Sequence, residues 1–409
     1  MKLKKIFLLL IIVVFSLSCK EKEITLTTKR NSIKGNNKFA LKLFHNLSKN
    51  SDENIFISPY SISTALAMTY GGAKGNTKEQ MRKALFLSED DLVLNNSFQY
   101  LIQSINELGN SNDNLELKTA NAIWVDRNFK INEKYEELIR SKYFSEINGM
   151  DFVNKPENSR IKINNWASEN TENKINNLIP EGLISEETRL VLTNAIYFLA
   201  DWQNQFKKRY TKKADFHLSS GKKIKIKMMY QNEHFRYTEN EKMQIIELPY
   251  KNDRLSMLIF LPKSTDSNNF DSLLTINSLN DNIQGLKTEK VRLFLPKFKF
   301  TYFSSLNDIL KEMGMKDAFT ERADFSGINK NKQEKLMISN VLHKAYIDVT
   351  ETGTEAAAAT AVTMKLTSAL PTKKPIVFKA DHPFIFIIWD DQTEQILFIG
   401  KLKHPEEVK

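Results

Sequence analysis

The sequence is poor in the residues that build most enzyme sites. Among its 409 residues there is one cysteine, Cys19, so the chain can form neither an internal disulfide nor a cysteine-pair metal site. Its 13 glycines include no phosphate-binding loop and no Gly-x-Ser-x-Gly turn, and its 6 histidines are dispersed. The sequence therefore predicts no metal, no cofactor and no enzymatic activity. A serine hydrolase stays open as an alternative only because the members of a catalytic triad need not be adjacent.

The excess of positive charge is spread over the chain. With 59 Lys and Arg against 49 Asp and Glu, the net charge is +10. In the run 223–228, lysines alternate with apolar residues, which predicts the solvent face of a strand. A cluster could attract a polyanion, although an ordinary solvated surface also explains it; it consists of Lys207, Lys208, Arg209, Lys212 and Lys213. No basic motif is interleaved with aromatic residues, so we expect no nucleic-acid partner.

The N-terminus has the pattern of an export signal. Lysines within the first five residues precede an apolar run over 6–15, which is too short to span a membrane comfortably. The run ends just before Cys19. This arrangement resembles the lipid-attachment site of bacterial lipoproteins, although Ser16 stands where an aliphatic residue is usual.

The same pattern divides the chain. We predict a signal peptide over 1–18, a lipid-anchored polar tether over 19–36 and a folded domain over 37–409. The protein would be exported and held at the bacterial cell envelope by a lipid on Cys19, on the periplasmic side or at the cell surface.

Hydrophobic periodicity predicts helices early in the chain and strands late. Apolar residues recur at helical spacing over 39–47, which predicts an amphipathic helix. The nearly continuous apolar run 255–261 predicts a strand that is buried on both faces. Two further apolar runs, 384–389 and 396–399, flank a polar turn and predict a buried hairpin. This order of elements favours an α+β fold.

The segment 348–368 is compatible with two conformations. From Thr354 to Leu366 every second residue lacks a charge, while Glu355 and Lys365 fall on the other face, as in a half-buried strand. The four alanines at 356–359, however, favour a helix or a loop. A segment that fits both states is a candidate conformational switch.

This segment and several others resemble the serpin family. The switch segment is similar to the serpin reactive-loop hinge, and the motifs below follow the family's order over roughly 36 to 405. They are Asn54–Ile62, Asn121–Trp124, Thr193–Phe198, Ala323–Ile328, Asp381–Phe386 and Ile396–Gly400. The resemblance implies a single domain with three β-sheets, about nine helices and a reactive loop over about 351–378.

The resemblance also implies a mechanism. A serine protease would attack the reactive loop and form an acyl-enzyme, and the freed loop would insert into the central sheet and carry the protease with it. The distorted protease would lose its oxyanion hole and be inhibited irreversibly. A non-inhibitory serpin that acts as a binding module is the alternative. The small, uncharged inward residues of the hinge favour the inhibitor.

The resemblance assigns roles to individual residues. The hinge would consist of Glu351, Gly353, Thr354, Ala356, Ala357, Ala358, Ala359 and Thr360. A polar network beneath the sheet, where the strands must part, would contain Ser58, Ser61, Asn194 and His343. Trp202, Lys297 and Glu351 would lie at the top of the sheet, where insertion begins.

The family's usual spacing predicts the bond that the protease cleaves. Counting from Gly353 places it between Thr367 and Ser368, which favours elastase-like or subtilisin-like proteases. The bond between Lys365 and Leu366 is the alternative, and it would suit trypsin-like enzymes. The stretch after Ser368 is a few residues longer than in many relatives. We expect a monomer.

Overall fold

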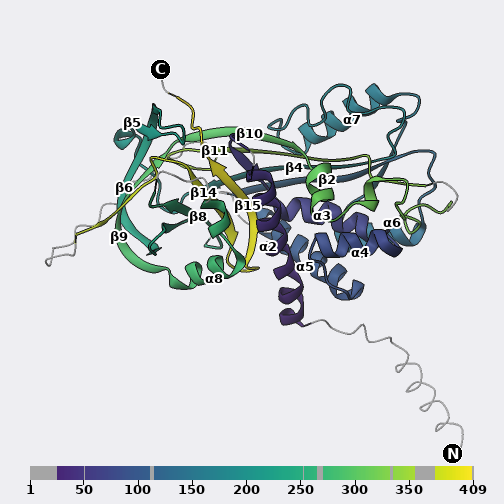
Figure 1. Cartoon of the computed structure of the whole chain (residues 1–409), viewed down its shortest axis with the longest axis horizontal. Helices are drawn as coiled ribbons and strands as arrows, with labels where there is room; N and C mark the ends of the chain where they lie inside the picture. Colours follow the sequence, from purple (N-terminus) through teal and green to yellow (C-terminus); the bar gives the residue numbers. More distant parts are fainter. Residues whose placement is uncertain are drawn as a thin grey trace, which may run out of the picture.

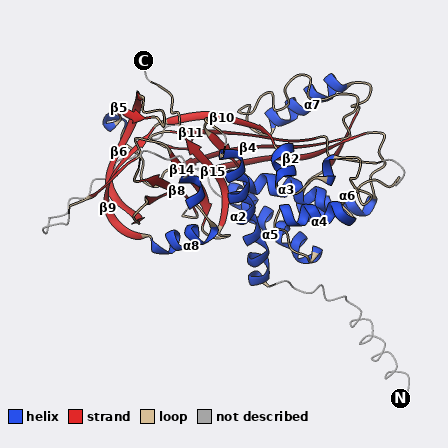
Figure 2. Cartoon of the chain, in the orientation of Figure 1, coloured by secondary structure: helices blue, strands red, loops and turns tan. Residues whose placement is uncertain are grey.

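Most of the expected folded domain is described by the structure. The computed structural model describes residues 25–49, 51–110, 115–251, 253–264, 270–331, 335–354 and 374–407. Figure 1 shows helices α2 to α6 gathered on one side of the molecule, with strands filling the other end. Figure 2 shows that the helices cover the strands rather than alternate with them, so the α+β fold is confirmed.

The described part of the chain contains α-helices α2 to α9. They are α2 (Leu26–Ser48), α3 (Pro59–Tyr70), α4 (Gly75–Ala84), α5 (Asp91–Asn110), α6 (Glu133–Tyr143), α7 (Pro156–Glu169), α8 (Ile276–Gly285) and α9 (Asn307–Glu312). The resemblance implies about nine, and the described residues form these eight. None of the described helices is long and apolar enough to cross a membrane.

The strands form two sheets within the described residues. One has six strands in the order β10-β11-β12-β4-β2-β3, and the other has the order β1-β15-β14-β8-β7-β6-β9-β13 with β5 paired to β6. Their bounds are β1 (Ile55–Ile57), β2 (Leu115–Asp126), β3 (Ile147–Met150), β4 (Leu190–Asp201), β5 (Lys212–His217), β6 (Lys223–Glu239), β7 (Met243–Pro249), β8 (Leu255–Pro262), β9 (Lys287–Pro296), β10 (Phe298–Ser305), β11 (Asn340–Val349), β12 (Gly353–Thr354), β13 (Ile376–Lys379), β14 (Phe384–Asp390) and β15 (Gln395–Leu402).

The expected three sheets appear as two because β6 is long. This strand of 17 residues pairs with β5 and β9 along most of its length and with β7 at its end, through Arg236–Glu239. Hydrogen bonding therefore joins into one sheet the strands that would otherwise form two.

The strands predicted from apolar runs lie where they were expected. β8 is buried along its whole length, and β14 and β15 form the predicted buried hairpin. The lysines of the 223–228 run are exposed and the residues between them are buried, as the alternation predicts. These strands form the core of the nine-stranded sheet.

The six-stranded sheet carries helices on both faces. α7 packs on one face through Ile163 and Ala167, which belong to the same buried cluster as Val191 of β4 and Leu342 of β11. α3 lies against the other face, as Figure 1 shows. Any movement of the strands of this sheet therefore affects the packing of both α7 and α3.

The predicted tether over 19–36 is wrong for residues 26–36. α2 begins at Leu26, where the Thr25 hydroxyl accepts a hydrogen bond from the Thr28 N–H at 3.2 Å. Ile33 and Asn36 are buried, with exposures of 2% and 5%. This polar stretch is helical because tertiary contacts bury one of its faces. The predicted signal peptide and Cys19 lie outside the described residues.

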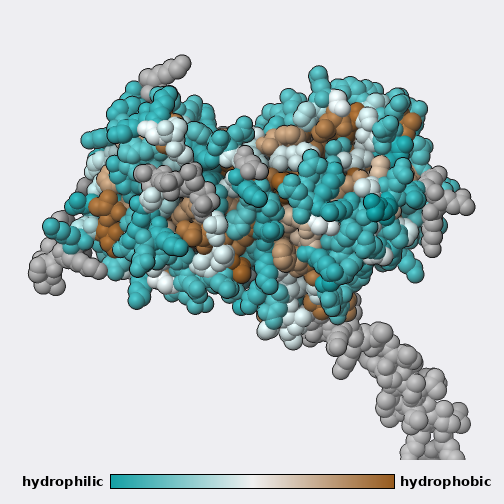
Figure 3. Space-filling view, in the orientation of Figure 1, coloured by the Kyte–Doolittle hydropathy of each residue, from teal (hydrophilic) through white to brown (hydrophobic). Residues whose placement is uncertain are grey.

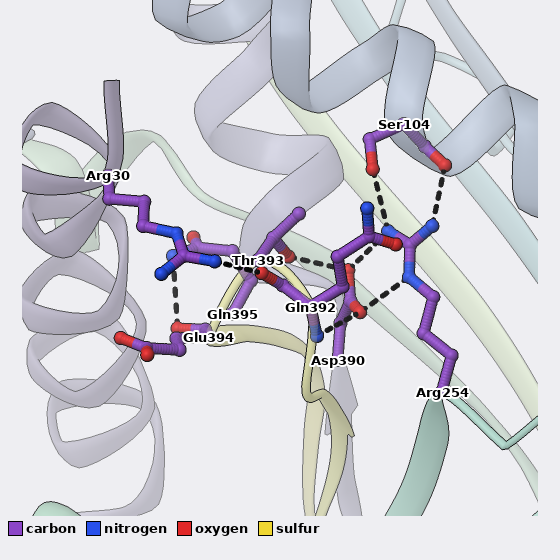
Figure 4. A network of polar contacts seen from close by, with 8 residues as sticks. All are labelled: Arg30, Ser104, Arg254, Asp390, Gln392, Thr393, Glu394 and Gln395. Carbon is purple, nitrogen blue, oxygen red and sulfur yellow. Dashed lines mark hydrogen bonds and ion pairs between the residues drawn. The ribbon is translucent and has the colours of Figure 1, made fainter. Parts of the chain in front are cut away.

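A polar network fixes the turn between β14 and β15 to α2 and α5 (Figure 4). The Arg254 guanidinium donates two hydrogen bonds to the Asp390 carboxylate, at 2.7 and 2.6 Å, and a third to the Ser104 hydroxyl of α5 at 2.8 Å. Arg30 of α2 donates to the carbonyl of Gln392. Because Asp390 is fully buried, its ion pair stabilises the C-terminal hairpin only while these partners stay in place.

Candidate functional site

Two central strands of the six-stranded sheet part at one end around the short strand β12. β11 and β4 pair in parallel through Asn340–Tyr346 and Val191–Tyr197, along a boundary that we call the seam. At the end of the seam near Val349 and Ala200, which we call the top of the sheet, the two residues of β12 lie between β11 and β4. Thr354 pairs with Val349 of β11 on one side and with Ala200 of β4 on the other, in both cases antiparallel. The expected hinge therefore starts inside the sheet.

The first hinge residues fit this position closely. A Cβ atom on Gly353 would lie 2.1 Å from the carbonyl oxygen of Ala200, so only glycine can pass between the strands here. The Thr354 side chain is fully buried, and its hydroxyl forms a hydrogen bond with the Tyr250 hydroxyl at 2.8 Å. The structure thus places Thr354 on the inward face, as the period of two predicts.

The residues expected at the top of the sheet are brought together. Lys297 donates to one oxygen of the Glu351 carboxylate at 2.9 Å, and the Thr211 hydroxyl donates to the other oxygen at 2.9 Å. Burial acts to raise the pKa of Glu351, but its hydrogen bonds to Lys297 and Thr211 outweigh burial, so the pKa of this carboxyl is lowered. Glu351 is therefore held as a carboxylate directly before the hinge glycine.

Trp202 fixes the chain that precedes the hinge. Its indole N–H donates to the carbonyl of Thr350 at 3.0 Å, and its backbone N–H donates to the carbonyl of Thr352 at 2.9 Å. The indole stacks on the ring of Tyr250, with centroids 4.6 Å apart. Trp202 is thus both a core residue and a hydrogen-bond partner of the hinge.

The four residues of the expected polar network lie together beneath the seam. Ser58 caps the N-terminus of α3, and its backbone N–H donates to Nε2 of His343 at 3.3 Å. Nδ1 of His343 donates to the Asn194 side-chain carbonyl, and the Asn194 amide donates to Ser61. His343 and Asn194 are paired residues of β11 and β4, so this network spans the seam.

Three hydrogen-bond partners of the polar network and the hinge were not predicted from the sequence. Asn121 of β2 accepts hydrogen bonds from Ser61 at 2.5 Å and from Asn194 at 2.6 Å, and so completes the network. Thr211 forms a hydrogen bond with Glu351, and Tyr250 forms one with Thr354. Asn121 lies in a motif that the sequence had singled out, but no spacing along the chain relates Thr211 or Tyr250 to the hinge.

His343 is buried as a neutral imidazole. Burial lowers its pKa from 6.5 to about 3, although it accepts one hydrogen bond and donates another. The unfolded chain takes up a proton below about pH 6.5 and the folded chain does not, so stability from this group is complete above that pH. As pH falls from about 6.5 toward 3, we expect this stability to be lost progressively, by roughly 1 kcal/mol per pH unit at most.

Urea unfolding between pH 7 and pH 4 measures this loss. His343→Gln keeps a donor and an acceptor but cannot be protonated, so its stability should depend less on pH than that of the wild type. His234→Gln, at an exposed histidine, is the matched control and should follow the wild type. Identical pH dependence in all three proteins would contradict a neutral buried His343.

A segment after α7 covers the seam. The Lys344 ammonium, on β11, donates to the carbonyls of Asn176 at 2.7 Å and Asn177 at 3.1 Å. Burial lowers the pKa of Lys344. These two hydrogen bonds attach the segment that follows α7 to β11, one of the two strands that form the seam.

The other predicted site residues lie outside the described residues. They are the hinge residues Ala356, Ala357, Ala358, Ala359 and Thr360, the bonds Thr367–Ser368 and Lys365–Leu366, and the lipidation site Cys19.

Known proteins match this chain over most of its length. A family model described as serpin (serine protease inhibitor) matches residues 34–405. A serpin-like protein from Thermococcus kodakarensis is 42% identical over 371 residues, which cover 91% of this chain and 85% of the relative. The leukocyte elastase inhibitor of Bos taurus is 38% identical over 380 residues, which cover 90% of this chain and 98% of the relative.

Solved structures agree with the sequence matches. The native state of the thermophilic serpin tengpin has a TM-score of 0.82 and 33% identity, and the match covers 94% of this chain and 96% of tengpin. Human thyroxine-binding globulin complexed with thyroxine has a TM-score of 0.84 and 28% identity, and covers 93% of this chain and 100% of the globulin. The chain belongs to the serpin family.

Proposed function

We propose that this chain is a suicide-type inhibitor of serine proteases that acts as a monomer. A protease cleaves the reactive loop, and the loop inserts between β11 and β4 before the acyl-enzyme is hydrolysed. Serpins are generally protease inhibitors rather than enzymes. The observation that carries the proposal is β12, because Gly353 and Thr354 already begin an antiparallel strand between β4 and β11.

The register of β12 gives the course of the inserted strand. If its pairing continued unchanged, Thr360 would lie beside Asn194 of β4 and His343 of β11, six residues beyond the observed pairs. These two side chains now bind each other across the seam. The Thr360 hydroxyl can donate and accept hydrogen bonds, so it supplies a new partner to both when they separate. The seam can therefore open without leaving buried polar groups unpaired.

A binding module is the second candidate. It is favoured by the likeness to thyroxine-binding globulin, which was solved as a complex with thyroxine. The hinge argues for the inhibitor, because Gly353 and the small Thr354 side chain fit between the strands and neither residue carries a charge.

A gel experiment separates these candidates. The chain is mixed with elastase-like, subtilisin-like and trypsin-like serine proteases and analysed under denaturing conditions. A band at the summed mass supports the inhibitor, and the same protease with its catalytic serine blocked should give none. Cleavage of the loop by every protease, without any such band, would favour the binding module.

The fragment released on complex formation identifies the cleaved bond. We expect the C-terminal fragment to begin at Ser368, because the cleaved bond must lie far enough from Gly353 for the inserted strand to reach the far end of the sheet. Mass spectrometry of this fragment is the measurement. A fragment that begins at Leu366 would assign the chain to trypsin-like targets, and one that begins beyond Leu370 would contradict the spacing argument.

We further propose that Cys19 carries a lipid and tethers the chain to a bacterial envelope. The support is the sequence pattern alone, a short apolar run followed by the chain's single cysteine. Cys19→Ser should leave the protein uncleaved or move it from the membrane fraction to the soluble fraction. Mass spectrometry of the wild-type N-terminus is the control. A mature N-terminus at another residue, without an acyl group, would refute the proposal.

A further inference from the structure

The basic cluster of the sequence, which we call the basic turn, lies at the base of the reactive loop. It consists of the exposed residues Lys207, Lys208, Arg209, Lys212 and Lys213. Lys207 caps the short helix Lys208–Tyr210, and the last two lysines begin β5. Among the described residues, Lys207, Lys208 and Lys212 have no carboxylate partner. Lys225 on the neighbouring strand is by contrast paired with Asp215 at 2.7 Å. The turn therefore carries uncompensated positive charge.

Two hydrogen bonds fix the basic turn to the hinge. The backbone N–H of Phe206, which precedes the turn, donates to the carbonyl of Glu351 at 2.8 Å. The Thr211 hydroxyl, within the turn, donates to the Glu351 carboxylate at 2.9 Å. The cations thus border the point where the chain leaves the sheet toward residues 355–373.

The other end of that segment is also bordered by cations. Lys374 is exposed where the described chain resumes, and the exposed Arg292 of β9 pairs with Val377 of β13. Neither cation has a carboxylate partner among the residues that the structure describes. Figure 1 shows β5, β6 and β9 together at one end of the molecule. Figure 3 shows a mostly hydrophilic surface at the upper left, over β5.

We propose that the basic turn, with Arg292 and Lys374, is a docking surface for the target protease and selects proteases with an acidic surface beside the active-site cleft. This inference rests on the proposed cleavage of the reactive loop. A protease that cleaves within 355–373 must approach the end of the molecule where both attachments of this segment lie. Opposite charges on the two surfaces raise the rate of encounter, and like charges lower it.

The position of the charges favours a protease over a polyanion. A linear polyanion that bound the basic turn would need no charge at the far attachment of the loop. A protease bound to the loop faces both attachments, and cations border both. The partner is therefore identified by an acidic rim around its cleft.

Anionic and cationic trypsin provide the test, because they share a cleft specificity and 355–373 contains Lys365 and Lys373. The measured quantity is the rate at which intact chain disappears, counted as complex plus cleaved product, at ionic strengths from about 20 to 500 mM. We expect the triple variant Lys207→Glu, Lys208→Glu, Arg209→Glu to slow reaction with anionic trypsin by about tenfold or more at low salt. The difference should shrink at high salt, and cationic trypsin should show the opposite preference.

A second triple variant is the matched control. Lys134→Glu, Lys155→Glu and Lys162→Glu change the net charge equally, on exposed residues at or near α6 and α7, away from the loop attachments. This variant should react like the wild type. Equal rates for both variants with both trypsins would overturn the proposal. A second outcome would also overturn it. If dextran sulfate accelerates the reaction only when the basic turn is intact, while the variants show no charge effect without it, the turn binds a polyanion rather than the protease.

The same data keep this inference separate from the proposed function. If only cleaved product forms, the inhibitor proposal fails while the charge dependence still reports on docking. If complex forms at rates that do not depend on charge, the inhibitor stands and the docking surface fails.

Discussion

Replacing Thr354 by arginine should convert the chain from an inhibitor of its target protease into a substrate. The Thr354 side chain is fully buried between β11 and β4 and contacts Tyr250, so an arginine there would place a charge in an apolar layer without a partner. An uncompensated buried charge costs roughly 3–5 kcal/mol. In the proposed mechanism insertion competes with hydrolysis of the acyl-enzyme, so slower insertion would release an active protease and a cleaved chain.

The expected effect is large enough for a gel. A cost of this size slows a step by about a hundredfold or more, so the complex band should nearly vanish while the cleaved band grows. The ratio of the two bands, measured with the protease that gives a complex with the wild type, is the readout. A ratio unchanged from the wild type would show that inhibition does not require residue 354 to be buried between β11 and β4.

Two matched variants test the register. Thr352→Arg changes a partly exposed side chain outside the hinge. The backbone carbonyl of residue 352 can still accept the hydrogen bond from the Trp202 N–H. Glu355→Arg places the same side chain on the outward face that the period of two predicts. Both should retain most of the complex. If Glu355→Arg is as damaging as Thr354→Arg, the inserted strand is shifted by one residue.

Local patterns predicted the strands that are buried without interruption. The run 255–261 and the hairpin 384–399 carry so many consecutive apolar residues that only a buried strand accommodates them, and the structure has β8, β14 and β15 there. The alternation in 223–228 is equally local. Such elements are readable because the signal lies within a few neighbouring residues.

The tether was mispredicted because its burial depends on distant residues. The polar stretch 26–36 shows no local apolar face strong enough to predict a helix. The carbonyl of Ile33 nevertheless accepts a hydrogen bond from the Gln395 side-chain amide at 3.3 Å, and the Arg30 guanidinium donates to the carbonyl of Gln392 at 3.4 Å. These partners lie 362 residues away along the chain, so the sequence near Ile33 contains no sign of them.

The candidate site was predicted only in part for the same reason. The resemblance supplied His343, Asn194 and Glu351, and the structure brings each into its expected cluster. Thr211 and Tyr250 reach the hinge because β4 and β7 end, and β5 begins, at the same corner of the fold. Which residues meet at that corner follows from strand pairing, not from spacing along the chain.

Cleavage of the reactive loop should make the chain more stable, in contrast to most proteolytic nicks. The seam of the intact chain is a parallel pair, β11 with β4, between neighbours that pair with them in antiparallel fashion. A strand that continues the direction of β12 is antiparallel to both. Insertion would therefore replace one parallel interface, the slightly weaker kind per residue, by two antiparallel ones.

We expect the cleaved chain to melt on the order of 10 °C or more above the intact chain, since each kcal/mol gained raises the Tm of a chain this size by roughly 2 °C. The measurement is thermal unfolding by circular dichroism, before and after cleavage by a protease that cuts between Thr360 and Lys373. Ala358→Pro is the matched variant, because proline removes a ladder N–H in the middle of the inserting strand. Cleavage should raise the melting temperature of this variant much less than that of the wild type. Equal melting temperatures for intact and cleaved wild type would mean that β12 does not extend and that the seam stays closed.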